Sequence, residues 1–175
     1  MTWTTLHHRG EILRAVAAAA AERRDGTLPM DVPGVAETFG DELSLLAALQ
    51  LRWHTRLSGH IERELMDQPM DLESGVVAAW QATADELPGV RLVLDRHRAE
   101  PLDEAMAAMV EKSVAKERTL LAMMAGRSSA PGDAAVRAGA DVERRARESH
   151  RPRAPRTHRA PTVGLLDRIK AVVAA

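Results

Sequence analysis

The sequence predicts an all-α fold, an antiparallel bundle of about four main helices followed by a basic tether and a short amphipathic helix. Apolar residues make up 45% of the chain and charged residues 28%, which is typical of a globular protein. The apolar residues are mostly Ala, Leu, Val and Met, with one Phe, three Trp and no Tyr. Because Ala, Leu and Met favour helices while aromatic residues favour strands, the composition indicates helices. No alternating strand pattern extends beyond a few residues.

The first half of the bundle contains two amphipathic segments. Residues 6–24 carry an apolar side, and the stretch RDGTLP ends this predicted helix. Residues 35–68 have the clearest pattern and predict one long helix. At 100° per residue, its apolar face consists of Leu43, Leu46, Ala47, Leu57, Ile61 and Leu65.

The second half begins at Asp71, a predicted N-cap. The stripe of the next helix consists of Leu72, Val76, Ala79, Trp80, Thr83 and Leu87. Pro88 either kinks this helix or starts a new one that continues to His97. A further stripe consists of Leu102, Met106, Met109, Ser113, Leu120 and Met124. We therefore place the bundle in residues 1–126, followed by a looser Arg-rich helix in residues 127–150 that has little to bury.

Charge is divided along the chain. The net charge is −1, but residues 137–175 carry ten basic and four acidic side chains, a net of +6, so the preceding residues carry −7. There are no cysteines, which excludes disulfides, thiol catalysis and Cys-ligated metals. Arginine far outnumbers lysine, as in proteins of GC-rich bacterial genomes. No apolar run reaches the roughly 20 residues that span a bilayer, and we expect a cytoplasmic protein, with peripheral membrane attachment as an alternative.

Two polar residues, Gln50 and His54, interrupt the apolar face of the second segment at an i, i+4 spacing. Buried polar side chains need hydrogen-bond partners. We expect these two to form a register-fixing network with Thr83 and Ser113 of neighbouring helices. The chain has no Gly-rich phosphate loop and no Gly-x-Ser-x-Gly elbow. The sequence therefore predicts a protein that is not an enzyme and needs no cofactor.

A metal centre is the alternative from another class. No histidine has a Glu three residues before it, which is the spacing used by di-iron carboxylate bundles. The stretch HIERE, with His60 and Glu64 on one helical face, resembles part of a hemerythrin-like ligand set. That resemblance implies a ferritin-like or hemerythrin-like four-helix bundle, with His54, His60 and Glu64 as candidate ligands. Trp53 and Trp80, in contrast, are expected in the core.

The last residues of the sequence combine a basic linker with an apolar stripe. The predicted basic tether contains seven arginines: Arg144, Arg145, Arg147, Arg151, Arg153, Arg156 and Arg159. Three prolines prevent a continuous helix, so residues 151–161 are interpreted as a linker. Residues 162–175 then form a short helix. Its predicted docking face consists of Leu165, Leu166, Ile169, Val172 and Val173.

A helix this short is marginal alone in water, so it must dock on something. Its own bundle, a groove on another protein and an anionic membrane are the three alternatives. The stretch VGLLDRIKAVV resembles the terminal membrane-targeting helices of bacterial division-site ATPases. It lacks an aromatic anchor, which favours a protein groove. Nucleic acid is the weaker partner because no aromatic residue is interleaved with the arginines, and homodimerisation stays open. We therefore expect a non-enzymatic adaptor or regulatory protein that docks through its C-terminal helix.

Overall fold

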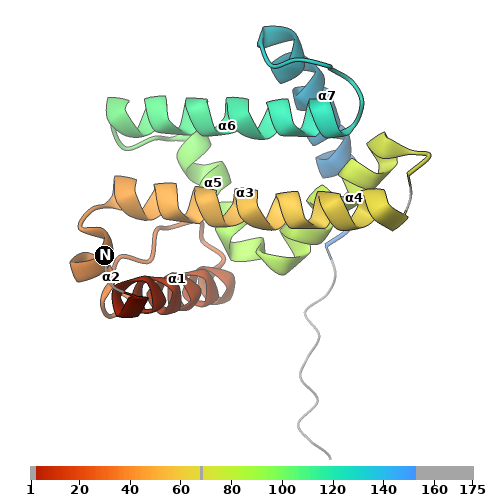
Figure 1. Cartoon of the computed structure of the whole chain (residues 1–175). Helices are drawn as coiled ribbons and strands as arrows, with labels where there is room; N and C mark the ends of the chain where they lie inside the picture. Colours follow the sequence, from red (N-terminus) through yellow and green to blue (C-terminus); the bar gives the residue numbers. More distant parts are fainter. Residues whose placement is uncertain (1–2, 68, 153–175) are drawn as a thin grey trace, which may run out of the picture.

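The computed structural model describes residues 3–67 and 69–152. This part of the chain folds into helices packed around one apolar core and contains no strand, so the predicted all-α class is confirmed (Figure 1). Its helices are α1 (Trp3–Arg23), α2 (Val35–Phe39), α3 (Glu42–Asp67), α4 (Leu72–Glu86), α5 (Pro88–Ala99), α6 (Glu104–Met124) and α7 (Asp133–Ser149). None of them is long and apolar enough to cross a membrane.

Residues 35–68 form two helices, so the prediction of one long helix was wrong. Gly40 ends α2 with a φ of 79°, a left-handed conformation that glycine adopts without steric cost. Asp41 then caps α3 by accepting a hydrogen bond from the backbone N–H of Ser44 at 2.7 Å. The apolar period continues across this break, which is why periodicity alone did not detect it.

Helix α3 runs through the centre of the molecule, with α1 and α6 on either side (Figure 1). Its buried face is centred on Trp53, which has no exposed surface. The indole ring of Trp53 meets that of Trp80 in α4 edge-to-face, with 5.7 Å between the ring centroids. Both tryptophans therefore belong to the core, as predicted.

Helix α5 begins at Pro88, so this proline starts a new helix rather than kinking α4. α5 packs mainly against α1. Gly89 allows that contact, because a Cβ at this position would overlap the backbone of Ala20 and Ala21. The close approach brings the last turn of α1 beside the α4–α5 junction.

Helix α7 is better packed than the sequence indicated. It crosses α6 and also contacts α4, and one of its faces is buried (Figure 1). That face consists of Ala135, Gly139, Val142, Glu143 and Ala146. A Cβ at Gly139 would overlap the backbone carbonyl of Arg118, so α6 and α7 approach closely. Small side chains make these contacts, so the scarcity of large apolar residues in α7 led to the wrong expectation that it buries little.

Candidate functional site

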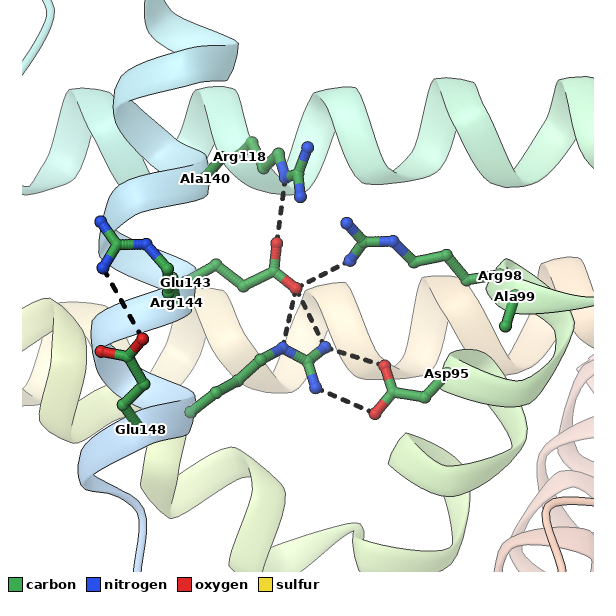
Figure 2. A pocket seen from close by; sticks show the side chains of 9 residues that line it. Asp95, Arg98, Ala99, Arg118, Ala140, Glu143, Arg144 and Glu148 are labelled. Carbon is green, nitrogen blue, oxygen red and sulfur yellow. Dashed lines mark hydrogen bonds and ion pairs between the residues drawn. The ribbon is translucent and has the colours of Figure 1, made fainter.

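One group of ion pairs surrounds a buried carboxylate. We call it the Glu143 cluster, and it is made of Glu143 and Arg147 from α7, Asp95 and Arg98 from α5, and Arg118 from α6. Glu143 is only 4% exposed. Its two carboxylate oxygens accept hydrogen bonds from Arg98 Nη1 at 2.8 Å, Arg118 Nε at 3.0 Å and Arg147 Nε at 2.9 Å (Figure 2). One carboxylate therefore joins three helices.

Arg147 connects this carboxylate to a second one. Its two terminal nitrogens donate to both oxygens of Asp95 at 2.8 and 3.0 Å, the paired geometry that a planar guanidinium allows (Figure 2). Asp95 also pairs with Arg91, one turn earlier in α5, at 2.9 Å. The guanidinium of Arg147 lies 4.9 Å from the centroid of the Trp80 ring, which places the ion pairs directly over the aromatic core.

The arginines decide the protonation state of these carboxylates. Burial raises the pKa of Glu143, but the charges of the surrounding arginines and the hydrogen bond from Arg118 outweigh it and lower the pKa to about 2. Burial also raises the pKa of Asp95, but the hydrogen bond from Arg147 and the positive charge of Arg91 outweigh this effect. The pKa of Asp95 is therefore lowered as well. Hydrogen bonds and charges from both acids raise the pKa of Arg147 despite its burial.

A pocket of about 500 Å³ opens beside the Glu143 cluster (Figure 2). Its charged rim includes Arg144 and Glu148, which form an exposed ion pair with 3.7 Å between Arg144 Nη1 and a carboxylate oxygen of Glu148. Both oxygens of Glu143 are already occupied by arginines. At neutral pH a carboxyl group with a pKa near 2 is ionised, so it has no proton to donate as a general acid. The cluster is therefore suited to hold α5, α6 and α7 together.

A second buried carboxylate belongs to Glu117 of α6, which is 4% exposed. It accepts hydrogen bonds from Trp80 Nε1 at 3.3 Å and Gln50 Nε2 at 3.5 Å. Arg91 Nη1 lies 3.7 Å from the same carboxylate, and the Arg91 guanidinium stacks over the ring of Trp53 at 4.6 Å. Glu117 thus joins α3, α4 and α5 to α6.

The polar network predicted from the sequence does not form. Thr83 donates to the carbonyl of Ala79 at 2.7 Å, and the Ser113 hydroxyl contacts the sulfur of Met109 at 3.5 Å, each within its own helix. Gln50, one of the four residues that were expected to interact, does reach a polar side chain on another helix, but within residues 3–67 and 69–152 that side chain is Glu117.

A cavity of about 1180 Å³, which we call the Trp80 cleft, lies between the end of α1 and helices α3, α4, α5 and α7. Two histidine–carboxylate pairs border it. His60 Nε2 lies 2.9 Å from Glu86, and His150 Nε2 lies 3.0 Å from Asp85. Trp80 itself lines the cleft, and so does Pro152, where the described part of the chain ends.

The candidate metal ligands do not come together. His60 pairs with Glu86 of α4 rather than with Glu64 of its own helix. Within residues 3–67 and 69–152, no three His, Asp or Glu side chains are grouped so that they could hold a metal ion, and His54 belongs to no such group.

The predicted docking face lies outside the described residues: Leu165, Leu166, Ile169, Val172 and Val173. The predicted basic tether is divided. Arg153, Arg156 and Arg159 also lie outside the described residues, whereas Arg144, Arg145 and Arg147 belong to α7. In α7 these arginines pair with acidic side chains of the fold, including Arg145 with Glu73 of α4. Arg151 follows the helix and donates to the carbonyl of Glu148 at 3.2 Å.

Sequence reasoning missed the two buried carboxylates. Glu117 lies four residues after Ser113 and four before Leu121, in register with the apolar stripe of α6. Glu143 lies between the buried residues Val142 and Ala146. A charged residue in register with a buried stripe is the signal that could have identified both. No protein-family model, curated protein or solved structure matches this chain.

Proposed function

We propose that this chain is a non-enzymatic adaptor or regulatory protein that docks on a partner protein through the apolar face of residues 162–175. The observation that carries the proposal is the anchored position of His150 and Pro152. His150 pairs with Asp85, and the side-chain amide of Gln81 donates to the Ala146 carbonyl at 3.0 Å and to Ser149 Oγ at 2.9 Å. The residues that follow Pro152 are thus attached to a fixed point at the rim of the Trp80 cleft.

Residues 153–161 separate this fixed point from the proposed docking face. Nine residues reach at most about 30 Å, enough to present a short helix to a neighbouring protein. Arg153, Arg156 and Arg159 add positive charge along this stretch, which would speed association with an acidic partner surface. The marginal stability of a short amphipathic helix in water favours burial of its apolar face in a groove.

The ionic groups of the fold support a binding role rather than a catalytic one. The buried carboxylates of Glu143 and Glu117 are held by arginines, a tryptophan N–H and a glutamine amide from neighbouring helices. These contacts fix the helices relative to one another and leave the Glu143 carboxylate ionised at neutral pH. Helices that are fixed in this way suit a rigid domain that carries a tethered binding segment.

The test compares the full chain, a truncation ending at Pro161, and the double variant Leu166→Glu, Ile169→Glu. Each is immobilised and exposed to lysate of the source organism, separated into soluble and membrane fractions, and bound proteins are quantified by mass spectrometry. We expect at least one soluble protein to be retained by the full chain and lost from the other two. The double variant Asp167→Asn, Lys170→Gln, on the polar side, is the matched control and should retain it.

Three outcomes would contradict the proposal. If all four proteins retain the same set, residues 162–175 are not the docking segment. If the truncation loses only membrane association, the segment binds lipid. Urea unfolding of the truncated chain is measured in parallel, because a loss of stability would instead indicate that these residues pack on their own bundle.

A further inference from the structure

A second surface, remote from the tail, has the features of a docking site. We call it the α1–α3 groove. It has a volume of about 740 Å³ and lies where α1 runs alongside the first half of α3 (Figure 1). Its lining consists of Arg9, Gly10 and Leu13 from α1, and Ser44, Ala47, Ala48, Leu51, Arg52, Thr55 and Arg56 from α3. α1 packs mainly on α5 and α3 mainly on α4, so no other helix of the described residues fills the groove between α1 and α3.

The floor of the groove is apolar. Leu13 and Ala48 pack against the core and also line the groove, and Leu51 is 67% exposed beside them. Gly10 and Ala47 are small and project little into the groove, so the backbone of a partner can approach closely there. Burial of an exposed leucine beneath a partner's apolar side chains lowers the free energy of the complex.

The rim of the groove is positively charged. Arg9, Arg52 and Arg56 line it, and no acidic side chain does among the residues that the structure describes. Arg9 donates to the carbonyl of Thr38 at 3.1 Å and stacks over the ring of Phe39.

Arg56 alone among these three has a carboxylate partner in the described structure, Glu86 at 3.2 Å. The Arg52 side chain has a buried Nε without a hydrogen-bond partner. Burial lowers the pKa of Arg52, and the positive charge of Arg56 lowers it further. Arg144, Arg145 and Arg147 of α7, by contrast, pair with acidic residues of the fold. Within the described residues, Arg9 and Arg52 therefore give the groove positive charge that is not paired with a carboxylate.

Length and charge together identify the occupant. The lining spans Ser44 to Arg56, about 18 Å along α3, which is the length of a helix of about 12 residues. An apolar floor with a cationic rim complements a helix that has an apolar stripe and acidic side chains along its flank. The chain's own residues 162–175 have the wrong charge, because Arg168 and Lys170 outnumber Asp167.

We propose that the α1–α3 groove is a docking site for an acidic amphipathic helix of a partner protein. Leu51 and Leu13 bury the apolar stripe of that helix, and Arg52 and Arg9 pair with its carboxylates. The site is independent of residues 162–175, so an adaptor that has both surfaces bridges two proteins.

The probe is a displayed library of 14-residue peptides with leucine fixed at positions 2, 5, 6, 9 and 13 and Glu, Lys, Gln or Ala randomised elsewhere. The full chain selects from this library, with counter-selection on Leu51→Glu. We expect Glu to be enriched over Lys in the retained pool. The affinity of one enriched peptide is then measured by fluorescence anisotropy at low and high salt, and binding should weaken as salt is raised.

Matched variants on α3 provide the controls. Leu51→Glu should weaken binding at least tenfold, whereas Met66→Glu, at an even more exposed apolar position near the end of the helix, should leave it unchanged. Arg52→Gln should weaken binding severalfold, and Arg63→Gln, outside the groove, should not. The truncation ending at Pro161 should bind the peptide as the full chain does, which separates this site from the tail.

Several results would overturn the proposal. These are an absence of enrichment, enrichment of Lys over Glu, or equal binding by Leu51→Glu and the full chain. A dimer in sedimentation velocity that Leu51→Glu dissolves would assign the groove to a second copy. Binding to phosphatidylglycerol vesicles that Leu51→Glu abolishes, without peptide selection, would assign it to a membrane.

Discussion

Arg98 of α5 donates a hydrogen bond to Glu143 of α7 at 2.8 Å, across 45 positions of sequence. The contact matters because α7 has few large apolar side chains with which to hold its place. Its buried face is made of alanine, glycine and one valine beside Glu143. Ion pairs and close backbone packing therefore both hold α7, the helix that precedes the C-terminal residues, in place.

Replacing Glu143 with glutamine should destabilise the fold by about 3 kcal/mol. The substitution keeps the size of the side chain but leaves Arg98, Arg118 and Arg147 close together without the carboxylate that neutralises them. Urea unfolding followed by tryptophan fluorescence measures the change. Glu148→Gln, an exposed position one turn later, is the control and should change stability by less than about 0.5 kcal/mol. Equal midpoints for the two variants would show that the cluster does not stabilise the fold.

The same carboxylate makes stability depend on acid pH. The pKa of Glu143 is 4.5 in an unfolded chain and about 2 in the fold. Because the folded pKa is the lower one, the contribution is complete above pH 4.5 and is lost as pH falls towards 2. It amounts to about 3 kcal/mol. The lowered pKa of Asp95 acts in the same direction.

The difference in unfolding free energy between wild type and Glu143→Gln isolates this contribution, since all other carboxylates are common to both proteins. We expect the difference to be largest at pH 5 to 7 and to shrink between pH 4.5 and 2. A difference that stays constant over this range would mean that the pKa of Glu143 is the same in the folded and the unfolded chain.

The sequence predicted those helix boundaries that depend on neighbouring residues in the chain. Asp71 caps α4, as predicted, and Pro88 begins α5, one of the two outcomes expected for it; each follows from a local backbone requirement. The break at Gly40 was local too, but the continuing apolar period hid it. A boundary inside a continuing apolar pattern was thus missed, even though Asp41 caps the helix that follows it.

The interior ionic groups depend on long-range geometry. Arg147 has the i, i+4 spacing of a helical ion pair with Glu143, but nothing in the sequence spacing pairs Glu143 with Arg98 of α5 or Arg118 of α6. Charged residues in helices are usually exposed. Only their register with buried neighbours distinguishes Glu117 and Glu143 from the solvated ones. The α1–α3 groove was equally hidden, because it depends on which neighbouring helices leave the two faces uncovered.

Gly139→Ala should destabilise the fold by roughly 1–3 kcal/mol, although alanine is the better helix former. A Cβ at this position meets the backbone carbonyl of Arg118, which cannot rotate away as a side chain can. Gly59→Ala in α3 is the matched control, because a Cβ there meets no atom within 4 Å. The control should be neutral or stabilising by up to about 1 kcal/mol. If both variants gained stability, α6 and α7 would not be in close contact in solution. Thermal unfolding followed by circular dichroism measures both.

Asp103→Ala should lower the free energy of unfolding by about 1 kcal/mol. The Asp103 carboxylate accepts a hydrogen bond from the backbone N–H of Met106 at 2.7 Å and lies at the positive end of α6. Asp103→Asn separates the hydrogen bond from the charge, because asparagine accepts the same bond and is an equally good cap. We expect the asparagine variant to keep most of the stability in urea unfolding at neutral pH. Equal losses in the two variants would assign the effect to the charge at the helix end rather than to the capping hydrogen bond.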